Sequence, residues 1–237
     1  MKRIHSSIRR RESSFQTLHR TDNRSCAFTL VELMVAMFVS GLVFMGLFQF
    51  TFSTSRLLFD STGKIDINRD VRMFTQHMSA YARASNCFFI YSSFNSEDRN
   101  SISDRKRANE SGDFLLLIYQ EPWPNSDDVE CITKLIGYFR KPDGTGADAK
   151  GPVYRFEIDY LPGSYPSTLT NTPEQLISVL SSNGTYERVW ELSRGLSDGK
   201  LFYNFFDRSI MVKAELFRGN DARRIADTYN FTVSPRG

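Results

Sequence analysis

The sequence predicts an α+β fold in which a long N-terminal helix packs on an antiparallel β-sheet. Two patterns carry this prediction. Apolar residues recur at helical spacing up to about residue 86, and beyond it they come in short runs with strand-like alternation. We therefore expect a leader over residues 1–27, a helix over residues 28–86 and an α+β domain over residues 87–237.

The leader is strongly basic, whereas the rest of the chain is slightly acidic. The whole chain carries a net charge of +3, with +5 in residues 1–27 and −2 in the remainder. Nucleic-acid binding would need a basic patch on the folded part, and the composition there indicates none. We therefore expect no nucleic-acid partner.

The first half of the helix is apolar enough to cross a membrane. About 20 residues, over roughly 30–52, match the length that spans a bilayer's hydrocarbon core. The basic leader predicts a cytoplasmic N-terminus and a domain outside the membrane. An ordinary cleaved signal peptide has a shorter apolar run and a cleavage site after it, so we expect this segment to stay in the mature protein.

Glu32 is the single charge between Phe28 and Ser55. Taken alone, it could be a carboxylate near a helix start that reaches toward the lipid headgroups and is favoured by the helix dipole. Cleavage between Ala27 and Phe28 would instead create an α-ammonium four residues before it, on the same helix face. The two charges could then neutralise each other within one chain or between neighbouring chains.

The stretch "AFTLVELMVAMFVSGLVF" resembles the class III signal of type IV prepilins and pseudopilins. The resemblance implies that a prepilin peptidase cuts after Ala27 and methylates Phe28, and that Glu32 serves filament assembly. One position departs from the family pattern, because Ala27 stands where the family usually has glycine. The resemblance also implies the pilin architecture, inner-membrane lipid around the helix, and other pilins or pseudopilins as partners.

The second half of the predicted helix carries one apolar stripe, on the face that would pack against a core. Its members recur at spacings of three and four: Ile67, Val71, Phe74, Met78 and Ala82. Gly63 predicts a kink or a local break. The stripe agrees with the pilin architecture, but any amphipathic helix packed on a core would show it too.

Beyond residue 86 the pattern predicts strands joined by polar connections. We expect strands at 87–92, 114–119, 130–141, 152–161, 200–206 and 209–217, and in the closing stretch "TYNFTVSPRG". Residues 93–113 are read as a mobile loop, and residues 172–182 as a short helix capped by Thr172. The strand at 152–161 alternates between an apolar and a charged face, which predicts a hairpin with one wet face.

This order of elements resembles, on weaker grounds than the N-terminal signal, the larger minor pseudopilins. These are the J type of type II secretion and the W type of type IV pili. The resemblance implies a structural or initiating subunit of a pilus or a pseudopilus.

The sequence offers little for chemistry. Of the three histidines only His77 lies beyond the leader, and no G-x-S-x-G, H-E-x-x-H or P-loop spacing occurs. We expect no enzyme activity, no cofactor and no small-molecule substrate. Asp143 and Asp148, in a glycine-rich connection, are weak calcium candidates, and a solvated turn is the favoured interpretation.

Cys87 and Cys131 are the two cysteines beyond the leader. In an exported domain such a pair is a candidate disulfide, and two unrelated thiols are the alternative.

The sequence therefore predicts a non-enzymatic minor pilin or pseudopilin of the bacterial inner membrane. The alternative is a signal-anchored binding module outside the cytoplasm that never joins a filament.

Overall fold

A computed structural model describes residues 29–123, 126–144, 149–195, 198–220 and 223–236. The chain divides into two compact units, with the boundary between Ser53 and Thr54. The division falls within one helix, α1 (Leu30–Ala84), so the second unit contains the last eight turns or so of α1 and everything after it.

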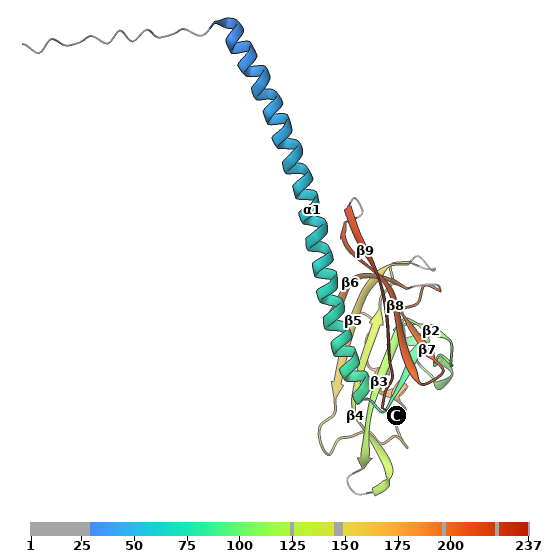
Figure 1. The fold of residues 1–237 in the computed structure, drawn as a ribbon. Helices are drawn as coiled ribbons and strands as arrows, with labels where there is room; N and C mark the ends of the chain where they lie inside the picture. Colours follow the sequence, from blue (N-terminus) through green and yellow to red (C-terminus); the bar gives the residue numbers. More distant parts are fainter. Residues whose placement is uncertain (1–28, 124–125, 145–148, 196–197, 221–222, 237) are drawn as a thin grey trace, which may run out of the picture. The chain divides into compact units, whose positions relative to one another are not determined.

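The second unit is built on one antiparallel sheet (Figure 1). Its strands are β1 (Cys87–Tyr91), β2 (Ser111–Gly112), β3 (Phe114–Trp123), β4 (Ser126–Arg140), β5 (Gly151–Asp159), β6 (Glu187–Gly195), β7 (Phe202–Phe205), β8 (Ser209–Asn220) and β9 (Arg223–Val233). The strand order is β1-β3-β4-β5-β6-β8-β7-β2. Strands β6 and β7 pair with different stretches of one edge of β8, and β9 pairs with the opposite edge. The predicted α+β class with a long N-terminal helix is confirmed.

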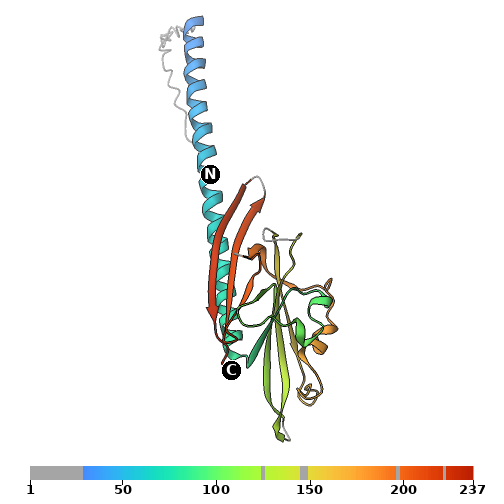
Figure 2. The ribbon, with the colours of Figure 1, turned by 90° about the vertical axis from the view of Figure 1, so that its right-hand side faces the viewer.

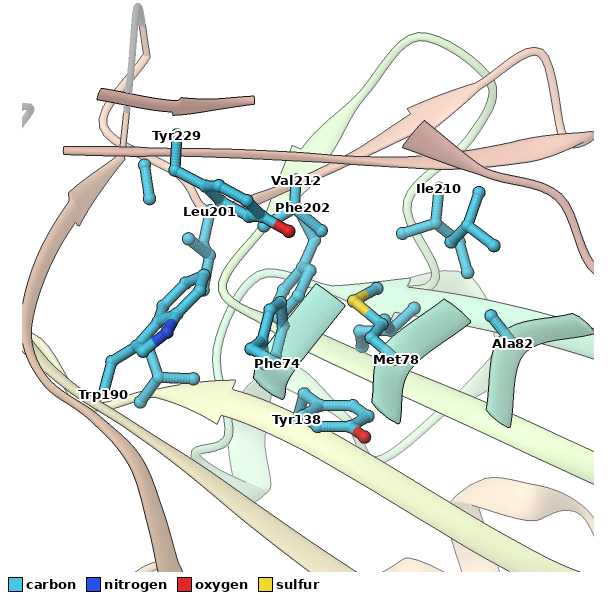
Figure 3. Packing of buried hydrophobic residues seen from close by; sticks show 14 of the residues in the cluster. Phe74, Met78, Ala82, Tyr138, Trp190, Leu201, Phe202, Ile210, Val212 and Tyr229 are labelled. Carbon is cyan, nitrogen blue, oxygen red and sulfur yellow. The ribbon is translucent and has the colours of Figure 1, made fainter. Parts of the chain in front are cut away.

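The apolar stripe of α1 packs on one face of this sheet (Figure 3). Phe74, Met78 and Ala82 are buried on successive turns. The Phe74 ring lies 4.2 Å from that of Trp190 and meets Tyr138 edge to face at 5.5 Å, measured between ring centroids. Burying such rings provides most of the free energy that holds an amphipathic helix on a sheet.

Gly63 does not interrupt α1, so the prediction of a local break there is wrong. The helix is continuous through this position, and Gly63 is buried. A Cβ atom built on Gly63 would lie 2.3 Å from Cδ1 of Ile225. The glycine therefore allows β9 to approach the helix closely, and Figure 2 shows β8 and β9 running beside this part of α1.

The opposite face of the sheet carries a second core. Phe114, Leu116 and Ile118 of β3 point into it, whereas Leu115 and Leu117 point toward α1. Because both faces of β3 are covered, "FLLLI" is apolar throughout instead of alternating.

The predicted hairpin of 130–141 with 152–161 is present as β4 and β5, but its charged face is only partly wet. Tyr154 and Phe156 pack in the second core, as the alternation predicts. On the other face, the side chain of Arg155 is 15% exposed. Its guanidinium lies 4.8 Å from the ring centre of Tyr81 on α1, which covers it.

Residues 93–113 form an ordered connection, where the sequence predicted a mobile loop. They contain two short 3-10 helices, Ser96–Asp98 and Ile102–Asp104, and strand β2. The buried Arg99 donates hydrogen bonds to the carbonyls of Phe94, Ile177 and Leu180. Ile177 lies in the last turn of α2 (Pro173–Ser178), where helix carbonyls lack partners within the helix, and Leu180 follows two residues after its end.

An ion pair ties the same connection to the N-terminal end of α2, the short helix that Thr172 caps as predicted. Arg105 donates to both carboxylate oxygens of Glu174, at 2.6 and 3.0 Å, and the Tyr91 hydroxyl donates at 2.7 Å. Burial acts to raise the pKa of Glu174, but the hydrogen bonds from Arg105 and Tyr91 outweigh it and hold the pKa below its ordinary value.

Candidate functional site: the N-terminal signal helix

Thr29 and Glu32 form a reciprocal cap at the first turn of α1. The Thr29 backbone N–H and hydroxyl donate to Oε2 of Glu32 at 2.9 and 3.0 Å, and the Glu32 N–H donates to the Thr29 hydroxyl at 3.3 Å. This is a capping box, in which Thr29 is the N-cap and Glu32 the third helical residue. The Glu32 carboxylate is thus held at the N-terminal end of the helix, where the helix dipole favours negative charge.

The helix that follows has no covered face within the first unit. Every residue from Thr29 to Ser53 is exposed, including large side chains such as Leu30 at 75% and Phe48 at 78%. Among the described residues, α1 is the one helix long and apolar enough to cross a membrane, by length and composition. So much exposed apolar surface needs lipid or other apolar helices around it.

Residues 22–48 match the prokaryotic N-terminal methylation motif, which is the class III prepilin signal. The match supports a type IV pilin-like protein. The motif implies processing by prepilin peptidase, and together with the apolar helix it indicates a membrane-anchored protein. No curated protein and no solved structure matches the chain significantly.

The predicted processing residues, Ala27 and Phe28, lie outside the described residues. Of the residues that the signal assigns to processing and assembly, the structure places Glu32 alone. Its partner Thr29 was missed by the sequence reasoning. The signal was available, since threonine followed three residues later by glutamate before an apolar run is the sequence signature of a capping box.

The candidate disulfide does not form in this structure, where Cys87 and Cys131 are both free thiols. Cys87 on β1 pairs with Ile118 of β3, whereas Cys131 on β4 pairs with Glu121 of β3. The cysteines are thus two strands apart and offset by three residues, about 14 Å from the spacings of a sheet. A disulfide needs Cα atoms within about 7 Å. Burial raises the pKa of the Cys87 thiol to about 11, so it is poorly reactive at neutral pH.

The two calcium candidates are not brought into a described site. Asp143 lies at the base of a turn, where its N–H donates to the carbonyl of Lys150 at 2.6 Å, and Asp148 lies outside the described residues. In the part of the chain that the structure describes, no three His, Cys, Asp or Glu side chains gather in a way that could hold a metal ion. His77 is exposed on α1, as expected from its place beside the stripe.

Proposed function

We propose that this chain is a minor pilin or pseudopilin, a structural or initiating subunit of a type IV pilus or a type II secretion pseudopilus. The observation that carries the proposal is the methylation motif at the start of an apolar helix whose residues are all exposed up to Ser53. The role is non-enzymatic. The helix would pack in the filament, and the large sheet domain that follows it suits a subunit at the tip or at initiation.

The proposed topology follows from charge. The leader is basic and α1 becomes apolar directly after it, so the N-terminus stays in the cytoplasm and the sheet domain lies in the periplasm. Before assembly the apolar part of α1 is held in the inner membrane. In the filament the same surface packs against the helices of neighbouring pilins or pseudopilins in an open-ended array.

Glu32 supplies the proposed specific contact in that array. Cleavage after Ala27 leaves an α-ammonium on the residue that precedes Thr29. The Thr29 cap already holds the Glu32 carboxylate at this end of the helix. A neighbour's ammonium can therefore pair with it, which lowers the free energy of placing the carboxylate in an apolar array.

A second candidate function has one observation in its favour. Because Glu32 caps its own helix, a purely local role would also explain it, and the chain would then be a membrane-anchored binding module outside the cytoplasm. Two substitutions separate the proposals. Glu32→Leu removes the carboxylate, whereas Thr29→Ala removes only the hydroxyl half of the cap.

The test expresses each variant in the native host and measures its amount in sheared filaments, with N-terminal processing followed by mass spectrometry. Filament assembly predicts that Glu32→Leu is processed but lost from the filament fraction, whereas Thr29→Ala remains in it. If both variants behave like the unchanged protein, or if the unchanged protein never enters the filament fraction, the anchored-module proposal replaces ours.

A further inference from the structure

An open groove of about 1150 Å³ lies in the sheet domain, at the start of β1. One side is β1 itself, with Phe88 and Phe89. The other sides come from separate parts of the chain: the segment 105–108, the β7–β8 turn and the tail after β9. This groove is independent of the N-terminal signal and is not used in the function proposed above.

The groove is basic although the domain as a whole is not. Lys106, Arg107, Arg208 and Arg236 line it, and none of them has a carboxylate within ion-pair distance among the described residues. The sequence predicted no basic patch on the folded part. It missed this one because the four cations come from three separate segments.

The two remaining charges at the groove already have partners. Arg105 is held by Glu174. Asp207, the single carboxylate in the lining, accepts a hydrogen bond from the side chain of Asn204 at 2.6 Å and helps to shape the turn. The four unpaired cations therefore give the groove a positive potential that favours an anionic ligand.

The floor of the groove is an unpaired strand edge. The carbonyl of Ile90 accepts from the Lys106 N–H at 2.7 Å, and that of Ser92 accepts from the Asp113 N–H at 3.1 Å, so these two residues turn their backbone away from β3. Backbone direction in a strand repeats every two residues, so the N–H and C=O of Phe88, like those of Ile90, point away from β3. Within the described residues, no backbone group bonds to Phe88 on that side.

The chain's own segments leave this edge open. After Lys106 the connection turns away from β1 and reaches Asn109, whose N–H donates to Asn204 on β7 at 2.7 Å. Asn109 has φ +69°, a left-handed turn conformation that redirects the chain. On the other side the tail places Pro235 at the groove, and proline has no N–H to donate.

We propose that this groove binds an acidic, extended polypeptide segment of a partner protein, which adds as a strand to β1 at Phe88. The free N–H and C=O of Phe88 offer main-chain hydrogen bonds, and the surrounding cations select carboxylate side chains. Unpaired edges are protected in most soluble proteins, so an open edge within a basic groove indicates a docking place.

A peptide fits the groove better than a single-stranded nucleic acid does. Nucleic-acid grooves combine cations with free aromatic faces on which bases stack. Here the Phe88 ring packs against the core beneath α1. The Phe89 ring is covered by the Arg105 guanidinium, 3.6 Å from its centre.

The experiment uses the full chain in non-ionic detergent and fluorescence anisotropy with three labelled probes. They are a short peptide of alternating glutamate and threonine, the same peptide with glutamine for glutamate, and a short oligothymidylate. We expect the acidic peptide to bind tightest. The double variant Arg107→Gln/Arg208→Gln should bind it about 5- to 30-fold more weakly, since two exposed ion pairs are lost.

The matched control is Lys64→Gln/Arg72→Gln, which removes the same charge from exposed positions on α1 and should bind like the unchanged protein. Hydrogen exchange supplies the second readout, because strand addition should slow exchange of the Phe88 amide when the acidic peptide is present. The proposal is overturned if oligothymidylate binds tighter than the acidic peptide, if both double variants bind alike, or if the Phe88 amide gains no protection.

Discussion

The packing of α1 on β9 can be tested by moving one methyl group between two residues. A Cβ on Gly63 would lie 2.3 Å from Cδ1 of Ile225, so the isoleucine methyl occupies almost the same space. Gly63→Ala gains about 1 kcal/mol of helix propensity. It also overpacks the contact, at a cost of about 1–3 kcal/mol. Ile225→Val removes Cδ1 and costs about 0.5–1.5 kcal/mol for the space left behind.

The double variant restores the contact, because the alanine methyl fills the space that valine leaves. We expect it to keep the helix-propensity gain without the overpacking and to be at least as stable as the unchanged protein. The coupling free energy between the two positions should then be about 2 kcal/mol or more, well above the few tenths that independent sites show.

The assay is urea unfolding of the full chain in non-ionic detergent, followed by tryptophan fluorescence, since Trp190 lies in the core beneath α1. The control cycle combines Ile225→Val with Gly41→Ala, because nothing lies within 4 Å of a Cβ at Gly41. That cycle should be additive. Additive behaviour of Gly63→Ala with Ile225→Val as well would refute a close approach of β9 to α1 at Gly63.

Three further predictions concern the sheet domain. Glu174→Gln should lower the free energy of unfolding at neutral pH by about 2 kcal/mol, because it breaks the charged hydrogen bonds with Arg105. Folding lowers the pKa of Glu174. Its contribution to the free energy of unfolding is therefore complete above the unfolded-state pKa of about 4.3 and is lost as the pH falls through the folded-state pKa. Unfolding curves of the variant and the parent should accordingly converge in acid. Alkylation of the protein unfolded without reductant, read by mass spectrometry, should find Cys87 and Cys131 both modified; a disulfide between them would contradict the strand register. Thr172→Ala should destabilise the domain by about 1 kcal/mol in the same urea assay through loss of the α2 cap, and no change would mean that α2 contributes nothing to cooperative unfolding.

Most of the fold could be predicted where one periodicity dominates. The stripe of α1 and the alternation of β8 are both visible in the sequence. Their residues are buried except Val71, which is partly buried; those of β8 are Ile210, Val212, Ala214 and Leu216. Strand β6 was missed because two of its inward positions hold Ser193 and Gly195. A Cβ on Gly195 would lie 2.3 Å from the carbonyl carbon of Gly199, and the Ser193 hydroxyl donates to the Gly151 carbonyl at 3.0 Å. These two positions therefore hold small or polar residues, and the apolar alternation is lost.

The connection 93–113 could not be predicted because long-range contacts order it. Its composition is that of a solvated loop. Yet Arg99 and Arg105 bind groups of α2 that are more than 60 residues away in sequence. The basic groove was missed for the same reason, since its cations meet only in the folded domain. The prepilin signal, by contrast, could be read in full because its residues are contiguous.

The central claim is tested most directly by the mass of the N-terminal peptide of the protein, taken from membranes of the native host. Processing as a pilin-like subunit predicts a peptide that begins at Phe28 and carries one N-methyl group. A peptide that retains the leader up to Met1 would show that the peptidase does not accept Ala27 before the cut, and would contradict the account.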